Sequence, residues 1–218
     1  VLDHLRYVGY SVDLLYVPGR LAFPWFCLAM AANLALARTV TTDGQWRYLG
    51  WLLLFSAISE IPYRMFIPDP NTLNVLPTLV LGLLVARGRQ DRALQTRLLA
   101  AGALLLAALF PERLMFGFFG VLLPLAMLLV IRRPWYFSLL PGLVCLAANQ
   151  LQVLFPGAAY GNSVSILGIA TCLIAPLAGL LLLRHAGQFK PPPPMRRWAY
   201  ALYPLHFLLL LAVRQIIA

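Results

Sequence analysis

The residues that could do chemistry in this sequence are ionisable side chains that stand within or at the ends of long apolar runs. An ionisable group inside a membrane segment costs about 2.5–3.5 kcal/mol on insertion scales. It is therefore kept where it forms an ion pair or has a function. Histidine suits acid–base catalysis best, because its ordinary pKa of about 6.5 lies near the working pH. The group comprises Asp3, His4, Arg6, Arg20, Glu60, Arg64, Glu112, Arg113 and His206.

Spacing limits what some of these residues can do. Glu60 and Arg64 are four positions apart, so they share one helix face provided that the helix continues through Pro62. Asp3 and His4 are adjacent, so their side chains diverge on a helix, and His4 would find an orienting carboxylate on another helix.

Structural roles compete with functional ones at each position. Chemistry and simple interfacial anchoring both stay open at His4 and Arg20, whereas Glu60 lies deep enough in an apolar run to indicate function or a buried ion pair. The residues 112–113 follow a proline and fit an ordinary turn, and His206 taken alone fits a packing or hydrogen-bonding histidine.

The elements that must position these residues are membrane helices. Hydrophobic residues make up 61% of the chain and charged residues 11%, with a mean hydropathy of +0.81; soluble domains carry about 25% charged residues. The net charge of +10 does not indicate nucleic-acid binding, because the arginines lie between apolar segments, where positive charge sets topology. The three cysteines lie in apolar runs without metal-ligand or disulfide spacing, and no metal site is expected.

We therefore expect an all-α, polytopic transmembrane bundle of about 8–9 helices, forming a single domain over 1–218. The run 1–4 reads like the end of a first helix that is truncated, and 191–194 is a stiff proline linker. The remaining predicted segments are 21–37, 48–66, 73–86, 98–110, 114–131, 135–155, 164–183 and 198–217.

Counting basic residues in alternate loops gives the bundle a direction. One set of loops holds 12 of the 17 Lys and Arg residues and two acidic residues, while the other holds five basic and five acidic residues. The positive-inside rule places the first set in the cytoplasm. The balanced acids and bases on the outer side indicate a polar site near the outer face.

Four stretches of the sequence resemble the TraX family, the membrane acetyltransferases of conjugative pilins. They are residues 2–5 (LDHL), 19–26 (GRLAFPWF), 54–63 together with 73–82, and 203–206 (YPLH). Their order spans almost the whole chain, although 98–184 carries little of the resemblance. Pro77 stands where a large apolar residue is expected.

The resemblance implies transfer of an acetyl group from acetyl-CoA to the N-terminal amine of a pilin subunit. It also suggests kinship with other transmembrane acyltransferases, in which an early-helix histidine is often essential. It implies that the pilin and the lipid bilayer are the partners, with no nucleic acid. The residues carried over from it are His4, Asp3 and Glu60 as catalytic groups, and Arg20, Asn74 and His206 as substrate- or cofactor-binding groups. Arg64, which the spacing pairs with Glu60, joins the second set.

The chemistry suits these residue types. A terminal α-amine has a pKa of about 7.7–8.0, so it must lose a proton before it attacks a thioester, and His4 is the natural base. Asp3 or Glu60 could orient the His4 ring or stabilise its protonated form. Arg20 could hold the thioester oxygen as it becomes negative or bind an acidic part of CoA, and Asn74 could donate to the same oxygen.

The location expected is the bacterial inner membrane, with the acceptor site toward the periplasm. Acetyl-CoA is cytoplasmic, so the acetyl group must cross, with CoA entering from the 87–97 or 132–133 side. Three alternatives stay open: an acyltransferase for a sugar, lipid or other acceptor; a transporter, which would predict inverted repeats and midplane charges; and a non-catalytic pilus-assembly factor.

Overall fold

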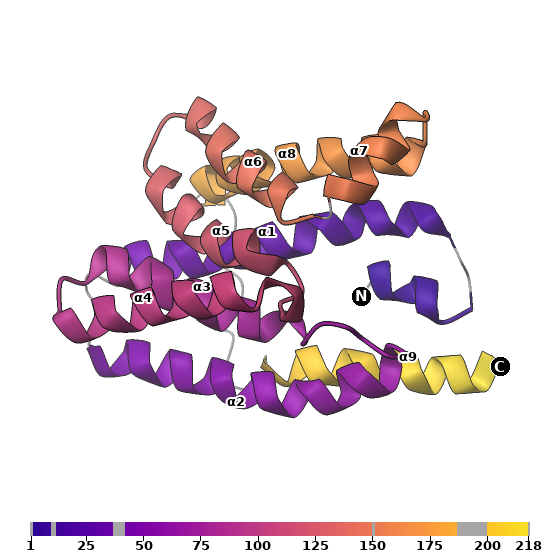
Figure 1. Ribbon diagram of the computed structural model, residues 1–218, viewed down its shortest axis with the longest axis horizontal. Helices are drawn as coiled ribbons and strands as arrows, with labels where there is room; N and C mark the ends of the chain where they lie inside the picture. Colours follow the sequence, from indigo (N-terminus) through magenta and orange to yellow (C-terminus); the bar gives the residue numbers. More distant parts are fainter. Residues whose placement is uncertain (1, 10–11, 37–41, 150, 187–199, 218) are drawn as a thin grey trace.

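The computed structural model describes residues 2–9, 12–36, 42–149, 151–186 and 200–217, and all regular secondary structure within them is helical (Figure 1). These residues contain nine α-helices, linked in part by short 3-10 turns, and no strand. The predicted all-α bundle is therefore confirmed. The chain before residue 2 and the proline linker at 191–194 lie outside the described residues.

The helices follow the apolar runs of the sequence. Their bounds are α1 Tyr16–Leu36, α2 Thr42–Phe66, α3 Val75–Gln90, α4 Leu94–Leu109, α5 Gly117–Val130, α6 Leu139–Ala147, α7 Leu151–Ala159, α8 Ser163–His185 and α9 Leu202–Ile217. The 3-10 turns are η1 Leu2–Tyr7, η2 Asp13–Leu15, η4 Pro111–Arg113 and η5 Trp135–Ser138.

Two predicted segments differ from the observed elements. The run 1–4, expected to end a truncated first helix, lies from residue 2 onward in the 3-10 turn η1 instead. The segment 135–155, expected as one helix, divides into η5, α6 and α7, with a bend of 96° between Trp135–Ala147 and Leu151–Ala159. The polar residue Asn149 follows α6 at this bend. In contrast, α2 continues through Pro62, as the predicted pairing of Glu60 and Arg64 requires.

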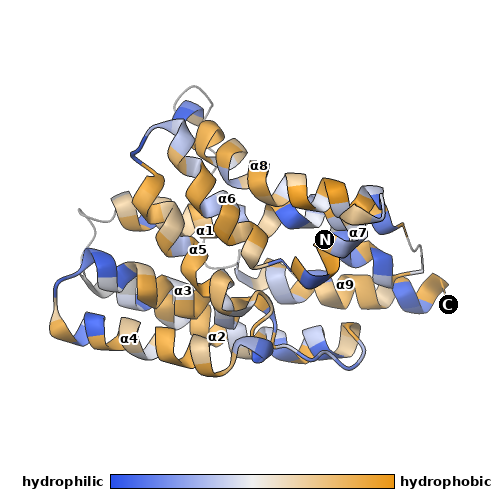
Figure 2. Cartoon of the chain, turned by 45° about the horizontal axis from the view of Figure 1, so that its top comes forward, coloured by the Kyte–Doolittle hydropathy of each residue, from blue (hydrophilic) through white to orange (hydrophobic). Residues whose placement is uncertain are grey.

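Several helices are long and apolar enough to lie in a membrane. The stretches Asp13–Ala35 and Ser163–His185 have 23 residues each and could cross it, and the bent pair α6–α7 would add a third crossing if it acts as one span. Shorter apolar helices are α4, α5 and α9. Figure 2 shows apolar residues along most of the helices and hydrophilic residues mainly near their ends. The chain is thus a membrane protein.

The core lies where α1, α3 and α5 pack together, with α8 and α6 on one side and α2 on the other. Close approach of α3 and α5 depends on Gly82, because a Cβ built there would stand 2.7 Å from Pro124. A second, smaller cluster joins α2, α9 and η1 around Phe66 and Phe207, both fully buried. Phe66 and Phe207 of this second cluster also lie against the ring of His4.

Contacts between helix ends separate the two sets of loops. At one end, Arg132 donates to the backbone oxygen of Ala35, both near predicted inner loops. At the other, Arg214 donates to the backbone oxygen of Phe66 at 2.8 Å, both at the predicted outer side. Among the described residues, each of these contacts therefore joins helix ends that belong to the same predicted set of loops.

Candidate functional site

The centre of the candidate site is a pair of histidines from opposite ends of the sequence. His4 lies on η1 and His206 lies in the second turn of α9. His4 Nδ1 and His206 Nε2 are 3.1 Å apart, within hydrogen-bond distance. Their rings are 20° from parallel, with centroids 5.2 Å apart. The fold thus supplies His4 with a histidine as its partner.

Aromatic rings enclose the pair. The centre of the Phe207 ring lies 4.9 Å from that of His4 and 4.0 Å from that of His206. The rings of Phe66 and His4 are close to perpendicular, with their centres 6.1 Å apart. η1 is outside the helices long enough to span a membrane. Burial, followed by the neighbouring His206, lowers the pKa of His4 to about 4, below the ordinary value expected from the sequence. His4 is therefore neutral at pH 7, the form in which a ring nitrogen can accept a proton.

The neighbouring Asp3 is the hub of an ion-pair cluster. Its Oδ1 lies 2.6 Å from Arg6 Nη2, and its Oδ2 lies 3.0 Å from Arg20 Nη2. Gly19 makes this approach possible, because a Cβ built on it would stand 2.5 Å from the Asp3 Cβ. The Gly19-Arg20 dipeptide therefore allows η1, which carries His4, to pack closely against α1.

Arg20 is held on several sides. Its Nη1 donates to Asn149 Oδ1 at 2.7 Å, and its guanidinium carbon lies 4.1 Å from the centre of the Tyr16 ring. The Asn149 amide, 2% exposed, donates in turn to the backbone oxygen of Cys145 at 2.7 Å. Arg20 Nε is buried and has no hydrogen-bond partner in the part of the chain that the structure describes. That nitrogen is a donor not used by the fold.

Sequence reasoning missed Asn149 and Tyr16. The signal for Asn149 is an amide inside the apolar segment 135–155, where an unpaired polar group would be costly. Tyr16 carries no comparable signal, because an aromatic residue at the start of an apolar helix is common at membrane interfaces.

Glu60, Arg64 and Asn74 form a separate cluster where α2 meets the start of α3. Glu60 Oε1 accepts from Arg64 Nε at 2.7 Å, and Glu60 Oε2 accepts from the Asn74 side-chain amide at 2.7 Å and its backbone N–H at 3.0 Å. Asn74 also donates to the backbone oxygen of Ser56 and caps α3 by accepting from Leu76 N–H at 2.9 Å. This cluster holds the first turn of α3 on α2.

Tyr203 links that cluster to the histidine pair. The Val75 N–H, next to Asn74, donates to the Tyr203 hydroxyl at 3.3 Å. The Tyr203 ring lies 5.3 Å from the ring of His206, one turn further along α9. The position of His206 therefore depends on how α3 begins.

The predicted site residues thus lie in three neighbouring clusters. Asp3 or Glu60 was expected to orient the His4 ring or to stabilise its protonated form. The described hydrogen bonds of both carboxylates go to Arg6, Arg20, Arg64 and Asn74. Asp3 turns away from His4 because adjacent side chains diverge. Glu60 bonds to Asn74 because the N-terminus of α3 lies next to it. The imidazole of His206 takes the place that a carboxylate was expected to fill.

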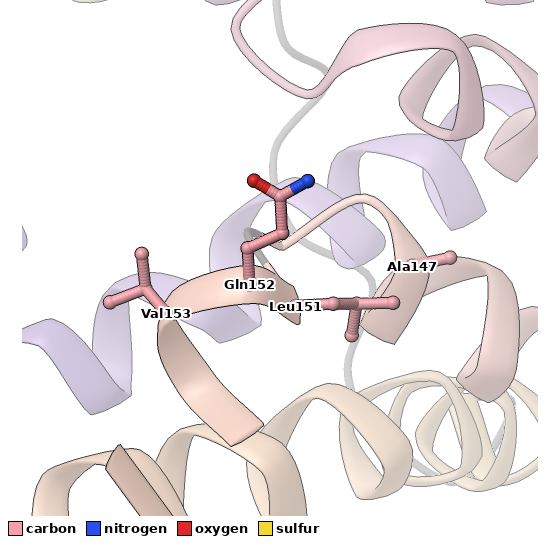
Figure 3. A pocket seen from close by; sticks show the side chains of 4 residues that line it. All are labelled: Ala147, Leu151, Gln152 and Val153. Atoms are coloured by element: carbon pink, nitrogen blue, oxygen red, sulfur yellow. The ribbon is translucent and has the colours of Figure 1, made fainter. Parts of the chain in front are cut away.

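A pocket of about 500 Å³ lies at the bend between α6 and α7. It is lined by Ala147, Leu151, Gln152 and Val153, which stand on both sides of the bend (Figure 3). Asn149, the partner of Arg20, lies in the same bend. Among the described residues, no group of three or more His, Cys, Asp or Glu side chains could hold a metal ion.

One comparison with known proteins gives a match. The family model described as "TraX protein" matches residues 1–214, almost the whole chain. No curated protein and no solved structure matches the chain.

Proposed function

The chain belongs to the TraX family, and from this we propose that it is an integral membrane N-acetyltransferase that moves an acetyl group from acetyl-CoA to the N-terminal amine of a pilin subunit. Family membership supports a pilin-associated role in conjugation. The observation that carries the acetyl transfer is the histidine pair, in which His4 is neutral and keeps its Nε2 without a partner in the described residues.

His4 serves as the general base of the proposed reaction. The pilin amine, partly neutral near pH 8, attacks the thioester carbonyl and forms the new C–N bond. The nitrogen then carries an extra proton, which passes to His4 Nε2. The C–S bond breaks, and the CoA thiolate leaves with the proton that His4 gives back, so His4 returns to its neutral form.

Arg20 stabilises the thioester carbonyl oxygen, which becomes negatively charged as the amine adds. Its guanidinium is fixed by Asp3, Asn149 and the Tyr16 ring, so it does not have to reorganise when the charge develops. The unpartnered Nε is a donor suited to an oxyanion or to an acidic group of CoA. The Asp3 carboxylate keeps this arginine next to η1, on which His4 lies.

Glu60, Arg64 and Asn74 act from a greater distance in the proposed enzyme. They fix the start of α3, whose Val75 N–H bonds to Tyr203, and Tyr203 packs on His206. In this role they position the histidine pair and do not touch the reacting atoms.

The proposal includes the membrane and the direction of the chain. His4 and Arg20 face the periplasm of the inner membrane, because the alternate set of loops in the sequence, to which they do not belong, holds 12 of the 17 basic residues. The donor reaches the site from that basic, cytoplasmic end.

Mass spectrometry of the pilin from cells with and without this protein tests the proposal. The expected result is an N-terminal mass one acetyl group higher with the protein present, and no such gain with His4→Gln. The control is His185→Gln, which changes an exposed histidine on α8. An unchanged pilin mass in the wild type would remove the pilin as acceptor, and full activity in His4→Gln would remove His4 as base.

A further inference from the structure

Two arginines of the described chain have buried nitrogens without a hydrogen-bond partner, but the fold treats them differently. Arg20 lacks a partner only at Nε, because its other nitrogens donate to Asn149 and Asp3. Arg87, in the last turn of α3, is 2% exposed, and both its Nε and its Nη1 are buried without a partner among the described residues. A buried charged group that the fold leaves unpaired is costly, so it points to a ligand from outside the chain.

The carboxylate one turn beyond Arg87 does not pair with it. Asp91 Oδ1 accepts from Ala93 N–H at 3.0 Å, and Asp91 Oδ2 accepts from the Thr96 hydroxyl at 2.8 Å. Both oxygens therefore fix the turn between α3 and α4. The carboxylates in the ion pairs of the described residues are those of Asp3 and Glu60. Within the part of the chain that the structure describes, Arg87 is thus a cation without a counter-ion.

The surroundings of Arg87 suit an anion. Its guanidinium carbon lies 4.2 Å from the centre of the Trp46 ring, near the start of α2. This stacking covers one flat face of the guanidinium and leaves its edges, which carry the N–H groups, for hydrogen bonds. The segment 87–97 holds four arginines and one aspartate, so the local charge attracts an anion.

We propose that Arg87 is the centre of a binding site for a phosphate group. The planar fork of guanidinium N–H groups matches the oxygens of a phosphate. Arg87 stands near the end of α3, so a change of its rotamer brings its head to the membrane surface, as long basic side chains allow. Two sources supply this chemistry: the headgroup phosphate of a lipid, which basic groups between membrane helices bind, and the phosphates of CoA. Only the CoA source rests on the proposed function.

Paired probes test the site on the full chain in a nonionic detergent, with binding measured by native mass spectrometry. Phosphatidic acid is compared with diacylglycerol, which lacks the phosphate, and CoA is compared with pantetheine, which lacks the phosphates and the nucleoside. We expect the phosphate-bearing member of at least one pair to bind about 10–100-fold more tightly, the size of a hydrogen bond to a charged group.

Substitutions on α3 assign that preference to one side chain. Arg87→Gln removes the charge and should reduce the preference by about 10–100-fold, whereas Arg87→Lys keeps the charge without the fork and should lose less. Arg89→Gln is the matched control, because it removes an exposed arginine from the same helical turn, and its affinities should stay within about fivefold of the wild type. Thermal unfolding without any probe verifies that each variant is folded.

The outcomes distinguish the two sources and the proposed function. A loss of phosphatidic acid binding in Arg87→Gln assigns the site to a lipid headgroup, and a loss of CoA binding assigns it to the acyl donor. Equal binding within both probe pairs, or equal losses in Arg87→Gln and Arg89→Gln, would overturn the inference, whether or not the pilin is acetylated. If the pilin is not acetylated but Arg87→Gln loses phosphatidic acid binding, the phosphate site stands and the proposed function fails.

Discussion

The histidine pair and the Glu60–Asn74 cluster are both polar groups in an apolar bundle, yet they use their hydrogen-bonding capacity differently. The Asn74 side chain donates to Ser56 and Glu60 and accepts from Leu76 N–H, and it is 1% exposed. His4 uses Nδ1 for His206 and keeps Nε2 without a partner in the described chain. The first arrangement fixes helices in place, and the second leaves an atom available for chemistry.

Substitution of His4 should produce the largest effect on activity and little effect on folding. His4→Gln removes the base, so we expect acetyl transfer to fall by about 10²–10⁴-fold, as for other general bases. Quantified acetylated pilin, at equal amounts of folded protein, is the measurement. If the loss of activity only follows a loss of folded protein, His4 belongs with Asn74 as a structural residue and the contrast collapses.

Gly19 tests whether the histidine side of the comparison depends on close packing of η1 on α1. Gly19→Ala places a methyl group 2.5 Å from the Asp3 Cβ, so η1 must shift and carry His4 with it. We expect a loss of about 1–3 kcal/mol in the free energy of unfolding and about 10–100-fold in activity from misplacement.

Gly50→Ala is the matched control for Gly19. It lies in α2, and nothing stands within 4 Å of a Cβ built there. Its free energy of unfolding, measured by thermal unfolding in detergent, should be unchanged or higher by up to about 1 kcal/mol. Equal behaviour of the two alanine variants would contradict the close contact between Gly19 and Asp3.

Asn74 should show the opposite profile from His4. Asn74→Ala removes the cap of α3 and the side-chain N–H groups that donate to Glu60 and Ser56, while the backbone N–H of residue 74 still donates to Glu60. We therefore expect the free energy of unfolding to fall by about 1–2 kcal/mol. Activity per folded molecule should fall by only a few-fold, through the contact of Val75 with Tyr203. Thermal unfolding and pilin acetylation, measured on the same preparation, separate the loss of stability from the loss of activity.

Asn162→Ala controls for capping alone. Asn162 caps α8 by accepting from Ser165 N–H at 3.1 Å. Its replacement by alanine should lower the free energy of unfolding by about 1 kcal/mol and leave activity unchanged. A larger activity loss in Asn74→Ala than in His4→Gln would move the reaction centre to the Glu60 cluster.

The smallest effect concerns pH. The pKa of His4 is lowered to about 4 in the folded chain from an ordinary 6.5, so between these values the unfolded chain binds a proton that the folded chain does not. Stability is therefore complete above pH 6.5 and declines as the pH falls, by about 1 kcal/mol between pH 7 and pH 5.5. Because His4→Gln lacks this titrating group, the unfolding temperatures of the wild type and His4→Gln should be close at pH 7 and separate as the pH falls to 5.5, with the wild type losing more. A constant difference would show that His4 is not buried as a neutral ring.

Local features of the site could be read from the sequence. The spacing of Glu60 and Arg64 predicted their contact, and the helix around Pro62 continues as that pairing required. Divergence of Asp3 from His4 was also expected, and Asp3 indeed turns to Arg6 and Arg20. These features involve residues within one helical turn, where spacing fixes direction.

Other parts of the site could not be derived in this way. His206 was identified from the family resemblance alone, because a single histidine in an apolar helix carries no signal of its partner. The bend after α6, which brings Asn149 to Arg20, lies in a segment that reads as one continuous apolar helix. Hydropathy measures only the apolar content of a segment, so it does not reveal a bend within that segment.

The sequence by itself determined that this chain is an all-helical membrane protein of the TraX family, with basic and balanced loops on alternate sides, because composition, charge and motifs are properties of the chain alone. Only the tertiary structure decided that the partner of His4 is His206, 202 residues away, and that Asp3 and Glu60 serve other groups. The physical reason is that α9 packs against α2 and η1 around Phe66 and Phe207. That packing, which no local pattern encodes, sets which polar atoms meet.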